Sequence, residues 1–455
     1  MNYISEQNDA RTIMRYNMKH MTLSTKPYKG ARDFYPEDKR IQKYILDTWR
    51  NAVERFGYEE YDAPMLESLE LYKAKTGEEI VNEQTYTFTD RGGREVVIRP
   101  EMTPTVSRMV AAKRQELPYP LRWYSIPNLW RYERAQRGRL REHWQLNVDL
   151  FGVSDSSAEH EMVLVADAIM KAFGATPSMY EIRINSRKLM TFVMDNYLGL
   201  DSVQQNTLSK LIDRMHKIPH AEFVAEADAM ITPTQRESGI SDKLLSLLEA
   251  KTIMELPDAV LSSEPAQELR RLLETLQDTG VNNALFDITI MRGFDYYTGI
   301  VFELTDTDPE NNRSMAGGGR YDGLVGLFGV EPLPTVGFGS GDVTMRNFLE
   351  SHGLLPKLKP STEVYAVLVG DVYKPAQKVI AKLREEGATV AVDASGRKIA
   401  QQIKTAVKLG IPYVLFIGEE ELQNEQYKLK NLLTEQESTL SLERIVSKVL
   451  DSRAN

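Results

Sequence analysis

The stretch Leu121–Val153, LRWYSIPNLWRYERAQRGRLREHWQLNVDLFGV, decides the fold class of this chain. Its two ends, Leu121–Glu133 and His143–Val153, are rich in aromatic and branched residues, which is the composition of β-strands. An arginine-rich loop lies between them, and helical patterns stand on both sides of the strand pair. Strands with helices between them predict an α+β fold.

The helices next to this stretch have recognisable starts. Thr103 is followed by Pro104, so we expect Thr103 to cap a helix and Pro104 to occupy its first turn. Ser156 and Glu159 have the spacing of a capping box at the start of a helix that ends at Gly174. One helix is therefore predicted before the strand pair and one after it.

The loop between the two strands carries arginines at Arg131, Arg134, Arg137, Arg139 and Arg141. A solvated charged surface usually mixes lysine with glutamate, whereas this run has no lysine. The planar guanidinium group can donate to two phosphate oxygens at once. The loop therefore favours contact with phosphate or nucleic acid, with a solvated surface as the alternative.

Composition limits the class of protein. The chain has 455 residues, of which 42% are hydrophobic and 27% charged, as is typical of globular proteins, and its length suggests about three domains. The absence of cysteine excludes disulfides, thiolate zinc sites and a cysteine nucleophile. The net charge of -9 argues against binding polyanions over the whole surface, although local basic patches suffice for phosphate contacts. The sequence has no P-loop, no His-Glu-x-x-His zinc helix and no apolar run long enough to span a bilayer.

Changes in pattern divide the chain into segments. We expect residues 1–25 to be an N-terminal extension, either disordered or a transit peptide, and residues 26–190 to be strand-rich α+β structure. Helix formers dominate residues 191–283, which we interpret as a helical insertion, and strand character returns in residues 284–355. After a linker, residues 362–455 alternate strand with helix, which predicts a small α/β domain with a mostly parallel sheet.

Two acidic residues stand in unusual places. Glu101 follows a predicted strand directly, and Asp149 lies among apolar residues in LNVDLFG. A carboxylate that points inward usually pairs with a cation. Both a structural ion pair and a cationic ligand satisfy this rule, so the residues alone leave the choice open.

Two glycine-containing segments complete the set. MRGFDYYTG (Met291–Gly299) places two tyrosines between predicted strands, with Arg292 at the end of the first strand. AGGGRYDG (Ala316–Gly323) has consecutive glycines, which allow either close backbone approach to a ligand or a tight bend. Arginines for phosphate, acids for an ammonium or imidazole group, and aromatic hydroxyls together suit an enzyme that uses ATP and a small cationic substrate.

The chain resembles the histidyl-tRNA synthetases, a family of class II aminoacyl-tRNA synthetases, from about Lys29 to its C-terminus. The motifs that carry the resemblance occur in the family's order: KGARDFYP (Lys29–Pro36), RPEMT (Arg99–Thr103), WRYERAQRGRLREHWQLNVDLFG (Trp130–Gly152), MRGFDYYTG and AGGGRYDG. The resemblance implies an antiparallel sheet core with helices, a homodimer, and anticodon binding by the C-terminal α/β domain. It also implies a cytoplasmic enzyme, not bound to a membrane, that uses ATP and Mg²⁺ to join L-histidine, through histidyl-adenylate, to the 3′ end of histidine tRNA.

The resemblance implies roles for individual residues in binding histidine. Glu101 and Gln145 would hold the α-ammonium group with Thr103 beside them, while Asp149 and Tyr297 would hold the imidazole. The full histidine-binding set that it implies is Glu101, Met102, Thr103, Gln145, Asp149, Tyr296, Tyr297 and Tyr321. The only metal it implies is the Mg²⁺ of Mg–ATP.

For ATP, the resemblance places Arg131 and Arg292 at the α-phosphate as catalytic residues, Glu133 near the adenine and Arg139 at the outer phosphates.

For tRNA, we expect contacts from Arg137 and from the C-terminal domain. Arg397, Lys404 and Lys408 are predicted to share one face of a helix in residues 396–410. The apolar residues Ile399, Ile403, Ala406 and Val407 are predicted on another face. A solvated basic face is the alternative interpretation.

The third class II motif departs from the family's pattern. Val343 and Thr344 stand where a glutamate and an ATP-contacting arginine are usual, and Arg346 points roughly the opposite way on a helix. Either another cation takes this role, or ATP binds less tightly, or catalysis is lost. A non-catalytic relative exists, the regulatory subunit of ATP phosphoribosyltransferase, but it resembles the catalytic core alone, so the C-terminal domain argues against that alternative.

Overall fold

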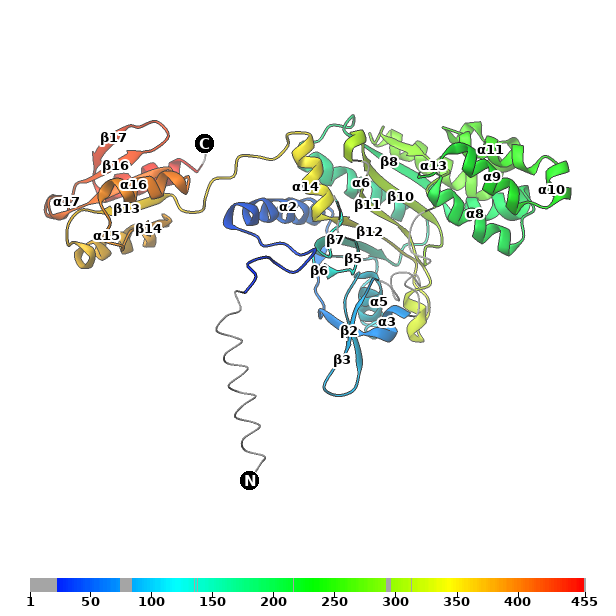
Figure 1. Ribbon diagram of the computed structural model, residues 1–455, viewed down its shortest axis with the longest axis horizontal. Coiled ribbons are helices and arrows are strands. Elements are labelled where there is room, and N and C mark those ends of the chain that lie inside the picture. Colours follow the sequence, from blue (N-terminus) through cyan, green and yellow to red (C-terminus); the bar gives the residue numbers. More distant parts are fainter. Residues whose placement is uncertain are drawn as a thin grey trace, which may run out of the picture. The chain divides into compact units, whose positions relative to one another are not determined.

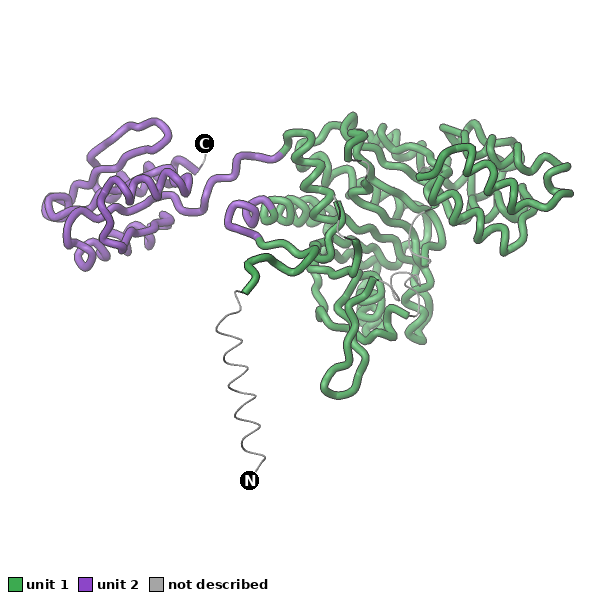
Figure 2. The backbone as a smooth tube through the Cα atoms, viewed as in Figure 1, with its two compact units in different colours: residues 1–33, 42–354 green, residues 34–41, 355–455 purple. Residues whose placement is uncertain are grey.

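The computed structural model describes residues 23–73, 84–134, 136, 138–215, 217–291, 296–311 and 313–453. The chain divides into two compact units, residues 1–33 with 42–354 (unit 1) and residues 34–41 with 355–455 (unit 2) (Figure 2). None of the described helices combines the length and the apolar character that crossing a membrane requires.

Unit 1 is built on a sheet whose described strands number nine, in the order β1-β5-β7-β12-β11-β10-β8-β9, with β6 paired to β7 (Figure 1). The pairings from β5 across to β8 are antiparallel, and the edge strands β1 and β9 run parallel to their neighbours. The strands are β1 (Glu59–Glu60), β5 (Leu121–Ser125), β6 (Asn128–Trp130), β7 (Glu142–Phe151), β8 (Tyr180–Ser186), β9 (Ala284–Phe286), β10 (Ile300–Asp306), β11 (Ser314–Arg320) and β12 (Thr335–Gly341). This antiparallel core with helices confirms the fold class expected from the sequence.

Helix α6 (Ser157–Ala172) packs against β10, β11 and β12. Arg320 of β11 points toward this helix, and its Nε donates to Glu159 Oε1 at 2.6 Å, with both side chains buried. Arg320 is therefore part of a structural ion pair, and the ligand-binding side chains occupy the opposite face of the sheet. The expected capping box is wrong, because Ser156 makes no capping bond and Asp155 Oδ1 instead accepts from the Ser157 amide at 2.9 Å.

Helix α5 (Thr103–Ala112) begins one residue earlier than expected. Met102 takes the N-cap position without a side-chain bond, so the prediction that Thr103 caps this helix is wrong. Val106 and Val110 of α5 pack against Leu121 and Phe151 of the sheet. A small antiparallel sheet lies beside α5, made of β2 (Leu66–Ser68), β4 (Glu95–Ile98) and β3 (Tyr86–Thr89), with α3 (Leu69–Lys73) on it.

Two further helices lie close to the sheet of unit 1. They are α2 (Pro36–Glu54), whose Ile45, Trp49 and Val53 are buried, and α14 (Asp342–Ser351), which follows β12 directly and contacts β7.

Between β8 and β9 the chain is almost entirely helical (Figure 1). The helices are α7 (Arg187–Phe192), η1 (Val193–Tyr197), α8 (Ser202–Arg214), α9 (His220–Met230), α10 (Pro233–Glu237), α11 (Ile240–Glu249), η2 (Ile253–Glu255), α12 (Asp258–Leu261) and α13 (Glu264–Asp278). Helix α13 returns the chain to the sheet, where it contacts β8, β9 and α6. Its Leu269, Leu272 and Leu276 are buried at the spacing that a helix needs to present one apolar face.

Unit 2 has a five-stranded sheet in the order β14-β13-β15-β16-β17. Its strands are β13 (Val364–Leu368), β14 (Val390–Val392), β15 (Tyr413–Ile417), β16 (Tyr427–Asn431) and β17 (Glu437–Leu440), and its helices are α15 (Tyr373–Glu385), α16 (Ile399–Lys408), α17 (Glu419–Asn424) and α18 (Leu442–Asp451). The expectation of a mostly parallel sheet is wrong, because β15–β16 and β16–β17 pair antiparallel. Strand β16 alternates Lys428 and Lys430 with Leu429. Because of these charged residues it has no continuous apolar run, and the sequence pattern did not indicate a strand there.

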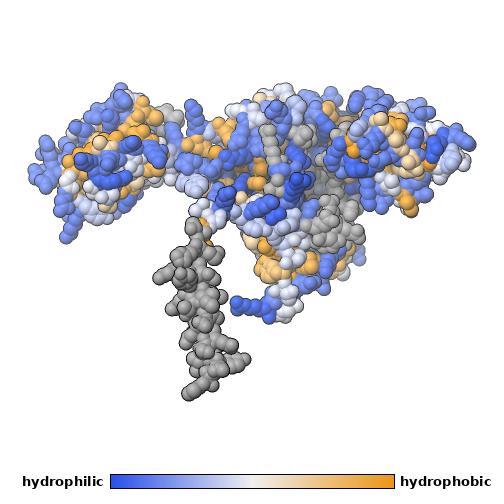
Figure 3. Space-filling model, viewed as in Figure 1, coloured by the Kyte–Doolittle hydropathy of each residue, from blue (hydrophilic) through white to orange (hydrophobic). Residues whose placement is uncertain are grey.

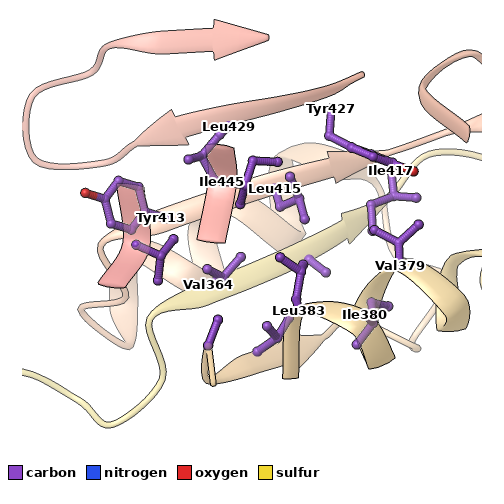
Figure 4. Packing of buried hydrophobic residues seen from close by; sticks show 14 of the residues in the cluster. Val364, Val379, Ile380, Leu383, Tyr413, Leu415, Ile417, Tyr427, Leu429 and Ile445 are labelled. Atoms are coloured by element: carbon purple, nitrogen blue, oxygen red, sulfur yellow. The ribbon is translucent and has the colours of Figure 1, made fainter. Parts of the chain in front are cut away.

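One apolar core of unit 2 packs α15 and α18 against one face of the sheet (Figure 4). Val364 and Leu415 meet Leu383 of α15 and Ile445 of α18 there, all of them buried.

Helix α16 covers the other face through Ala406, which packs with Val367 and Val414. The helix begins at Ile399, so Arg397 precedes it, and Ile399 and Val407 are 39% and 58% exposed. The predicted apolar face therefore holds for Ile403 and Ala406, which pack on the sheet, and not for Ile399 and Val407.

Candidate active site

Strand β7 supplies most of the polar side chains of the candidate site. Because alternate residues of a strand share one face, His143, Gln145, Asn147 and Asp149 point the same way. All four line one of two neighbouring cavities. The sequence analysis named only Gln145 and Asp149, although the same period of two would have found His143 and Asn147.

The smaller cavity has a volume of about 160 Å³. It is lined by Glu101, Thr103, Arg131, Gln145, Asn147, Asp149, Tyr296, Tyr297, Gly317, Tyr321, Gly337, Phe338 and Gly339. Met102 is fully buried and is not among these residues, so the cavity gives no support to its placement in the histidine pocket. Glu101 and Thr103 face the cavity, and the residue between them points into the core.

Asp149 lines the smaller cavity and is 3% exposed. Its Oδ1 accepts a hydrogen bond from the Tyr321 hydroxyl, whereas its Oδ2 is buried and accepts none from the described residues. Burial raises the pKa of this carboxyl to about 7, and the Tyr321 bond opposes the rise. Among the described residues no basic side chain forms an ion pair with Asp149, so the cavity offers it to a ligand that donates a proton or carries positive charge.

Glu101 lies on another wall of the smaller cavity and is 2% exposed. Its Oε2 accepts from the Tyr296 hydroxyl at 3.1 Å, and its backbone oxygen accepts from Tyr72 at 3.1 Å. The rings of Tyr296, Tyr297 and Tyr321 pack edge to face, with centroids 5.1 to 6.5 Å apart. The cavity is therefore a rigid aromatic pocket with a carboxylate on two sides.

Strand β12 makes room for these polar groups with glycines. Gly337 pairs with Asp149 and Gly339 with Asn147. A Cβ on Gly337 would lie 2.3 Å from Asp149 Oδ1, and one on Gly339 would lie 2.4 Å from Gln145 Nε2. Alternating glycines within a strand are the signal that points to this close approach, and the sequence analysis did not use it.

The larger cavity, about 200 Å³, adjoins the smaller one and shares Arg131, Gln145, Gly317 and Gly339 with it. Its remaining lining is Glu133, Gly138, Arg139, Leu140, His143, Ser314, Met315, Ala316, Gly341, Val343 and Thr344. Arg131 donates from Nε to the Pro100 oxygen at 2.9 Å, and Arg139 lies 3.3 Å from Glu133. Burial and the nearby Arg131 charge lower the pKa of His143 to about 3, so this imidazole is neutral at pH 7.

The other arginines of the loop have different places. Arg141 packs its guanidinium 3.8 Å from the Tyr132 ring centroid and donates from Nε to the Glu133 oxygen at 3.1 Å. It therefore holds the loop together, and Arg134 is exposed. Arg137 lies outside the described residues. Of the described arginines in the loop, Arg131 and Arg139 are the ones that line the cavity.

Arg292 also lies outside the described residues. Strand β9 ends at Phe286, and the chain turns directly afterwards. Asn185 stabilises this turn by donating from Nδ2 to the oxygens of Ile288 and Ile290 at 2.9 and 3.1 Å.

At the third motif, Val343 and Thr344 line the larger cavity and no arginine takes their place. Arg346 instead pairs with Glu350 at 2.8 Å along α14. In the part of the chain that is described, α14 thus brings no cation to this cavity.

One tRNA candidate of unit 2, Arg397, lies at a hollow of about 830 Å³ at the carboxyl ends of β13 and β14. Arg397 lines it and pairs with Asp393 at 2.7 Å, while Tyr373 and Ile399 stand half-exposed in its lining. Lys404 and Lys408 are exposed on α16. Because Arg397 precedes α16, it does not share a helical face with the two lysines as predicted.

An antiparallel sheet that holds a carboxylate-lined cavity against an arginine-lined one is the catalytic architecture of a class II aminoacyl-tRNA synthetase. The histidyl-tRNA synthetase family model matches residues 30–342, and the anticodon binding domain model matches residues 363–452. This chain belongs to the histidyl-tRNA synthetase family, whose members are histidine–tRNA ligases, as the sequence analysis expected.

Individual relatives agree with this assignment. A histidine–tRNA ligase of Leptospira biflexa is 44% identical over 95% of this chain and 99% of its own length. A histidine–tRNA ligase of Thermoplasma volcanium is 38% identical over 92% and 96%, respectively. The crystal structure of histidyl-tRNA synthetase from Nostoc sp. PCC 7120 has a TM-score of 0.79 at 25% identity, covering 95% of this chain and 100% of that one.

A protein from Bacillus halodurans C described as an ATP phosphoribosyltransferase regulatory subunit/histidyl-tRNA synthetase has a TM-score of 0.70. It is 22% identical and covers 88% of this chain, so that likeness shows the fold alone.

Proposed function

We propose that this protein activates L-histidine with ATP to give histidyl-adenylate and then transfers the histidyl group to the 3′ end of histidine tRNA. The observation that carries the proposal is the shared wall of the two cavities, where Arg131 and Gln145 line both. A substrate in one cavity can therefore react with a substrate in the other without leaving the sheet face.

The smaller cavity suits histidine as its substrate. Glu101 and Gln145 hold the α-ammonium group, with Thr103 beside them. Asp149 offers its Oδ2 to one imidazole nitrogen, and Tyr297 stands at the same pocket. An amino acid without ring nitrogens would leave this buried carboxylate unpaired, which is the basis of strong discrimination.

The larger cavity suits ATP. A carboxylate oxygen of histidine attacks the α-phosphorus, the new O–P bond forms as the bond to the β-phosphate oxygen breaks, and pyrophosphate leaves. Arg131, on the shared wall, and Arg292 stabilise the charge on the α-phosphate, while Arg139 meets the outer phosphates and Glu133 lies near the adenine. A hydroxyl of the tRNA terminal ribose then attacks the histidyl carbonyl and AMP leaves.

Mg²⁺ enters this scheme with ATP as the Mg–ATP complex and neutralises part of the charge on the phosphates. Among the described residues there is no group of three His, Asp or Glu side chains that could hold a metal ion by itself. The chain's own contribution is to place cations around the phosphates.

The experiment that tests the proposal is histidine-dependent ATP–pyrophosphate exchange, followed by charging of histidine tRNA. We expect both activities with the wild-type chain. A complete lack of exchange at saturating ATP would instead favour a regulatory subunit of the kind found beside ATP phosphoribosyltransferase, a second candidate that rests on the altered third motif.

Unit 2 is proposed to bind the anticodon region of the tRNA, with Arg397, Lys404 and Lys408 near its contacts and Arg137 meeting the tRNA from unit 1. Lys404→Glu combined with Lys408→Glu should lower tRNA charging about tenfold, because two phosphate-attracting charges are reversed. Pyrophosphate exchange should stay within twofold of wild type. Lys378→Glu with Lys382→Glu is the matched control, since it has the same spacing on the exposed side of α15.

The homodimer is proposed from an uncovered face of the small sheet in unit 1. Leu66 pairs with Ile98 and Phe88 with Val96, which places all four side chains on one face. Leu69 and Tyr72 pack with Val97 on the other face. Leu66 and Phe88 are each 48% exposed, and Figure 3 shows hydrophobic residues gathered over this part of the molecule.

A change of oligomeric state tests the dimer. Leu66→Glu with Phe88→Glu should halve the mass measured by analytical ultracentrifugation. Val203→Glu, at an exposed apolar residue of α8, should leave the mass unchanged.

Each segment of the chain has its own proposed role. Residues 26–190 and 284–355 form the adenylating core, residues 191–283 a helical insertion, residues 362–455 the anticodon-binding domain and residues 1–25 an extension. We place the enzyme in the cytoplasm, where its tRNA substrate is used.

A further inference from the structure

The larger cavity carries little positive charge for a triphosphate. Of its described lining residues, Arg131 and Arg139 are cationic, and Arg139 lies against the Glu133 carboxylate at 3.3 Å. His143 is neutral because its pKa falls to about 3. Phosphoryl and nucleotidyl transfer depend on fixed cations around the phosphates, so the loss of an arginine at Thr344 creates a deficit that another residue has to fill.

Arg313 lies beside the place where the missing arginine would start. Gly138 lines the cavity and has a φ of +76°. A Cβ built on Gly138 would lie 3.2 Å from Arg313 Cγ and 3.7 Å from Thr344 Cγ2. The stem of Arg313 and the side chain of Thr344 therefore approach the same glycine of the arginine-rich loop from two different elements.

A β-bulge brings the chain near Arg313 to the cavity. The pairing of β10 with β11 shifts register between Leu304 and Thr305, which pair with Ala316 and Ser314 respectively. Bulges re-aim side chains and often lie next to functional sites. Here Ser314, directly after Arg313, lines the larger cavity together with Met315.

The guanidinium of Arg313 is available for a ligand. Among the described residues no carboxylate forms an ion pair with it, and the side chain is half-buried. Arg313 lines a neighbouring hollow of about 620 Å³ rather than the larger cavity, and the lining of that hollow holds more carboxylates, such as Glu303 and Asp306, than cations. Its Cγ lies next to Gly138 of the larger cavity, so a different rotamer of this long side chain would be needed to turn the guanidinium toward that cavity.

We propose that Arg313 supplies the ATP-facing cation that position 344 lacks. Its guanidinium reaches past Gly138 and binds the outer phosphates of ATP from the side of β11. The inference rests on the proposed function, because it concerns the ATP that the larger cavity is proposed to hold. It assigns the lost role of the third motif to a residue before the strand that carries AGGGRYDG.

The test compares Arg313→Ala and Arg313→Lys with wild type in ATP–pyrophosphate exchange. Arg313→Ala should raise the KM for ATP about tenfold or more and leave the KM for histidine within twofold, because one charge-assisted phosphate contact is lost. Arg313→Lys should retain part of the affinity. Arg346→Ala is the matched control and should leave the KM for ATP unchanged, since Arg346 is engaged by Glu350 along α14.

A second variant tests the shared position. Thr344→Arg added to Arg313→Ala should recover most of the lost ATP affinity, which a merely structural role of Arg313 would not allow. An unchanged KM for ATP in Arg313→Ala, or no recovery by Thr344→Arg, would overturn the inference. Failure of the proposed function is a different result, because wild-type protein would then show no exchange and no ATP-dependent rise in melting temperature.

Discussion

The cavity that holds Asp149 and the cavity that holds Arg139 share a wall, but they are framed by different kinds of structure. The smaller cavity takes Gln145 and Asp149 from the central strand β7, and its carboxylates are nearly inaccessible to solvent. The larger cavity takes Arg139 and Glu133 from a loop, and Arg139 is 51% exposed. Strands fix a small substrate by shape, whereas the loop leaves room for a large, highly charged one whose own charge completes the site.

The largest effect is expected at the shared wall. Arg131→Ala should lower kcat for pyrophosphate exchange by about 100- to 1,000-fold, because a fixed cation at the reacting phosphate is removed. The KM values for histidine and ATP should change much less than kcat. If the variant lost affinity for only one substrate, Arg131 would act in only one of the two cavities, and it would not belong to a shared wall.

Asp149→Asn probes the strand-built cavity next. Asparagine keeps the volume and can still accept from Tyr321, but it removes the negative charge that is proposed to bind the imidazole. We expect the KM for histidine to rise about 100-fold and the KM for ATP to stay within twofold. Equal changes in both constants, measured by pyrophosphate exchange, would assign Asp149 a structural role instead.

Gly337→Ala tests how tightly the smaller cavity is packed. The added Cβ would lie 2.3 Å from Asp149 Oδ1 and 2.7 Å from the Val148 oxygen, so the carboxylate has to move. We expect the KM for histidine to rise about tenfold and stability to fall by about 1–3 kcal/mol, as overpacking usually costs. Gly323→Ala, where an added Cβ meets no atom within 4 Å, is the control and should behave as wild type.

The burial of Asp149 also predicts a dependence of stability on pH. Its pKa is about 7 in the folded protein and about 4 in an unfolded chain, so the folded state binds more protons between these values. The contribution to folding stability therefore falls as pH rises from about 4 to 7 and is constant above, at about 1.4 kcal/mol per unit of pKa.

Melting temperatures of ligand-free protein check this dependence. Asp149→Asn should melt above wild type at pH 8, and the two curves should converge near pH 4. If the difference in melting temperature between the two proteins stays constant across this pH range, burial does not destabilise the charged form of Asp149.

The smallest effect is expected in the loop-built cavity. Arg139 is half-exposed and already paired with Glu133, so its net contribution to binding is small. Arg139→Ala should raise the KM for ATP about two- to fivefold in pyrophosphate exchange. If Arg139→Ala lowered pyrophosphate exchange as much as Arg131→Ala, the loop would contribute to ATP binding as strongly as β7 is proposed to contribute to histidine binding.

The strand-built cavity was also the more predictable one from sequence. Asp149 stood out because a carboxylate among apolar residues usually points inward toward a cation, whereas Gln145 was named through the resemblance to the family. Met102 was named because motif resemblance treats neighbouring residues alike, whereas at the start of α5 Glu101 and Thr103 face the cavity and Met102 points into the core. Gly337 and Gly339 were missed although their alternation within a strand is a sign of close approach, and only the opposite strand shows which side chains come close.

The loop-built cavity was less predictable because arginines serve several purposes. Arg141 binds the loop to Tyr132 and Arg320 pairs with Glu159 behind the sheet, yet in sequence both resemble phosphate ligands. Arg313 belongs to none of the sequence motifs, and only the packing around Gly138 draws attention to it. The location of a long flexible cation depends on tertiary contacts, which periodicity does not encode.

Strand β7 contributes side chains to both cavities, so its geometry would determine which substrate length fits the proposed site. In the proposed function, Gln145 binds the amino-acid backbone and Asp149 binds the ring, and their side chains converge on the substrate from positions four residues apart on β7. A homologue of histidine with one more or one fewer methylene can satisfy either end, but it then places its carboxylate away from Arg131. The length of the amino acid therefore affects the adenylation step more than binding. Such analogues should bind in the pocket without being adenylated efficiently.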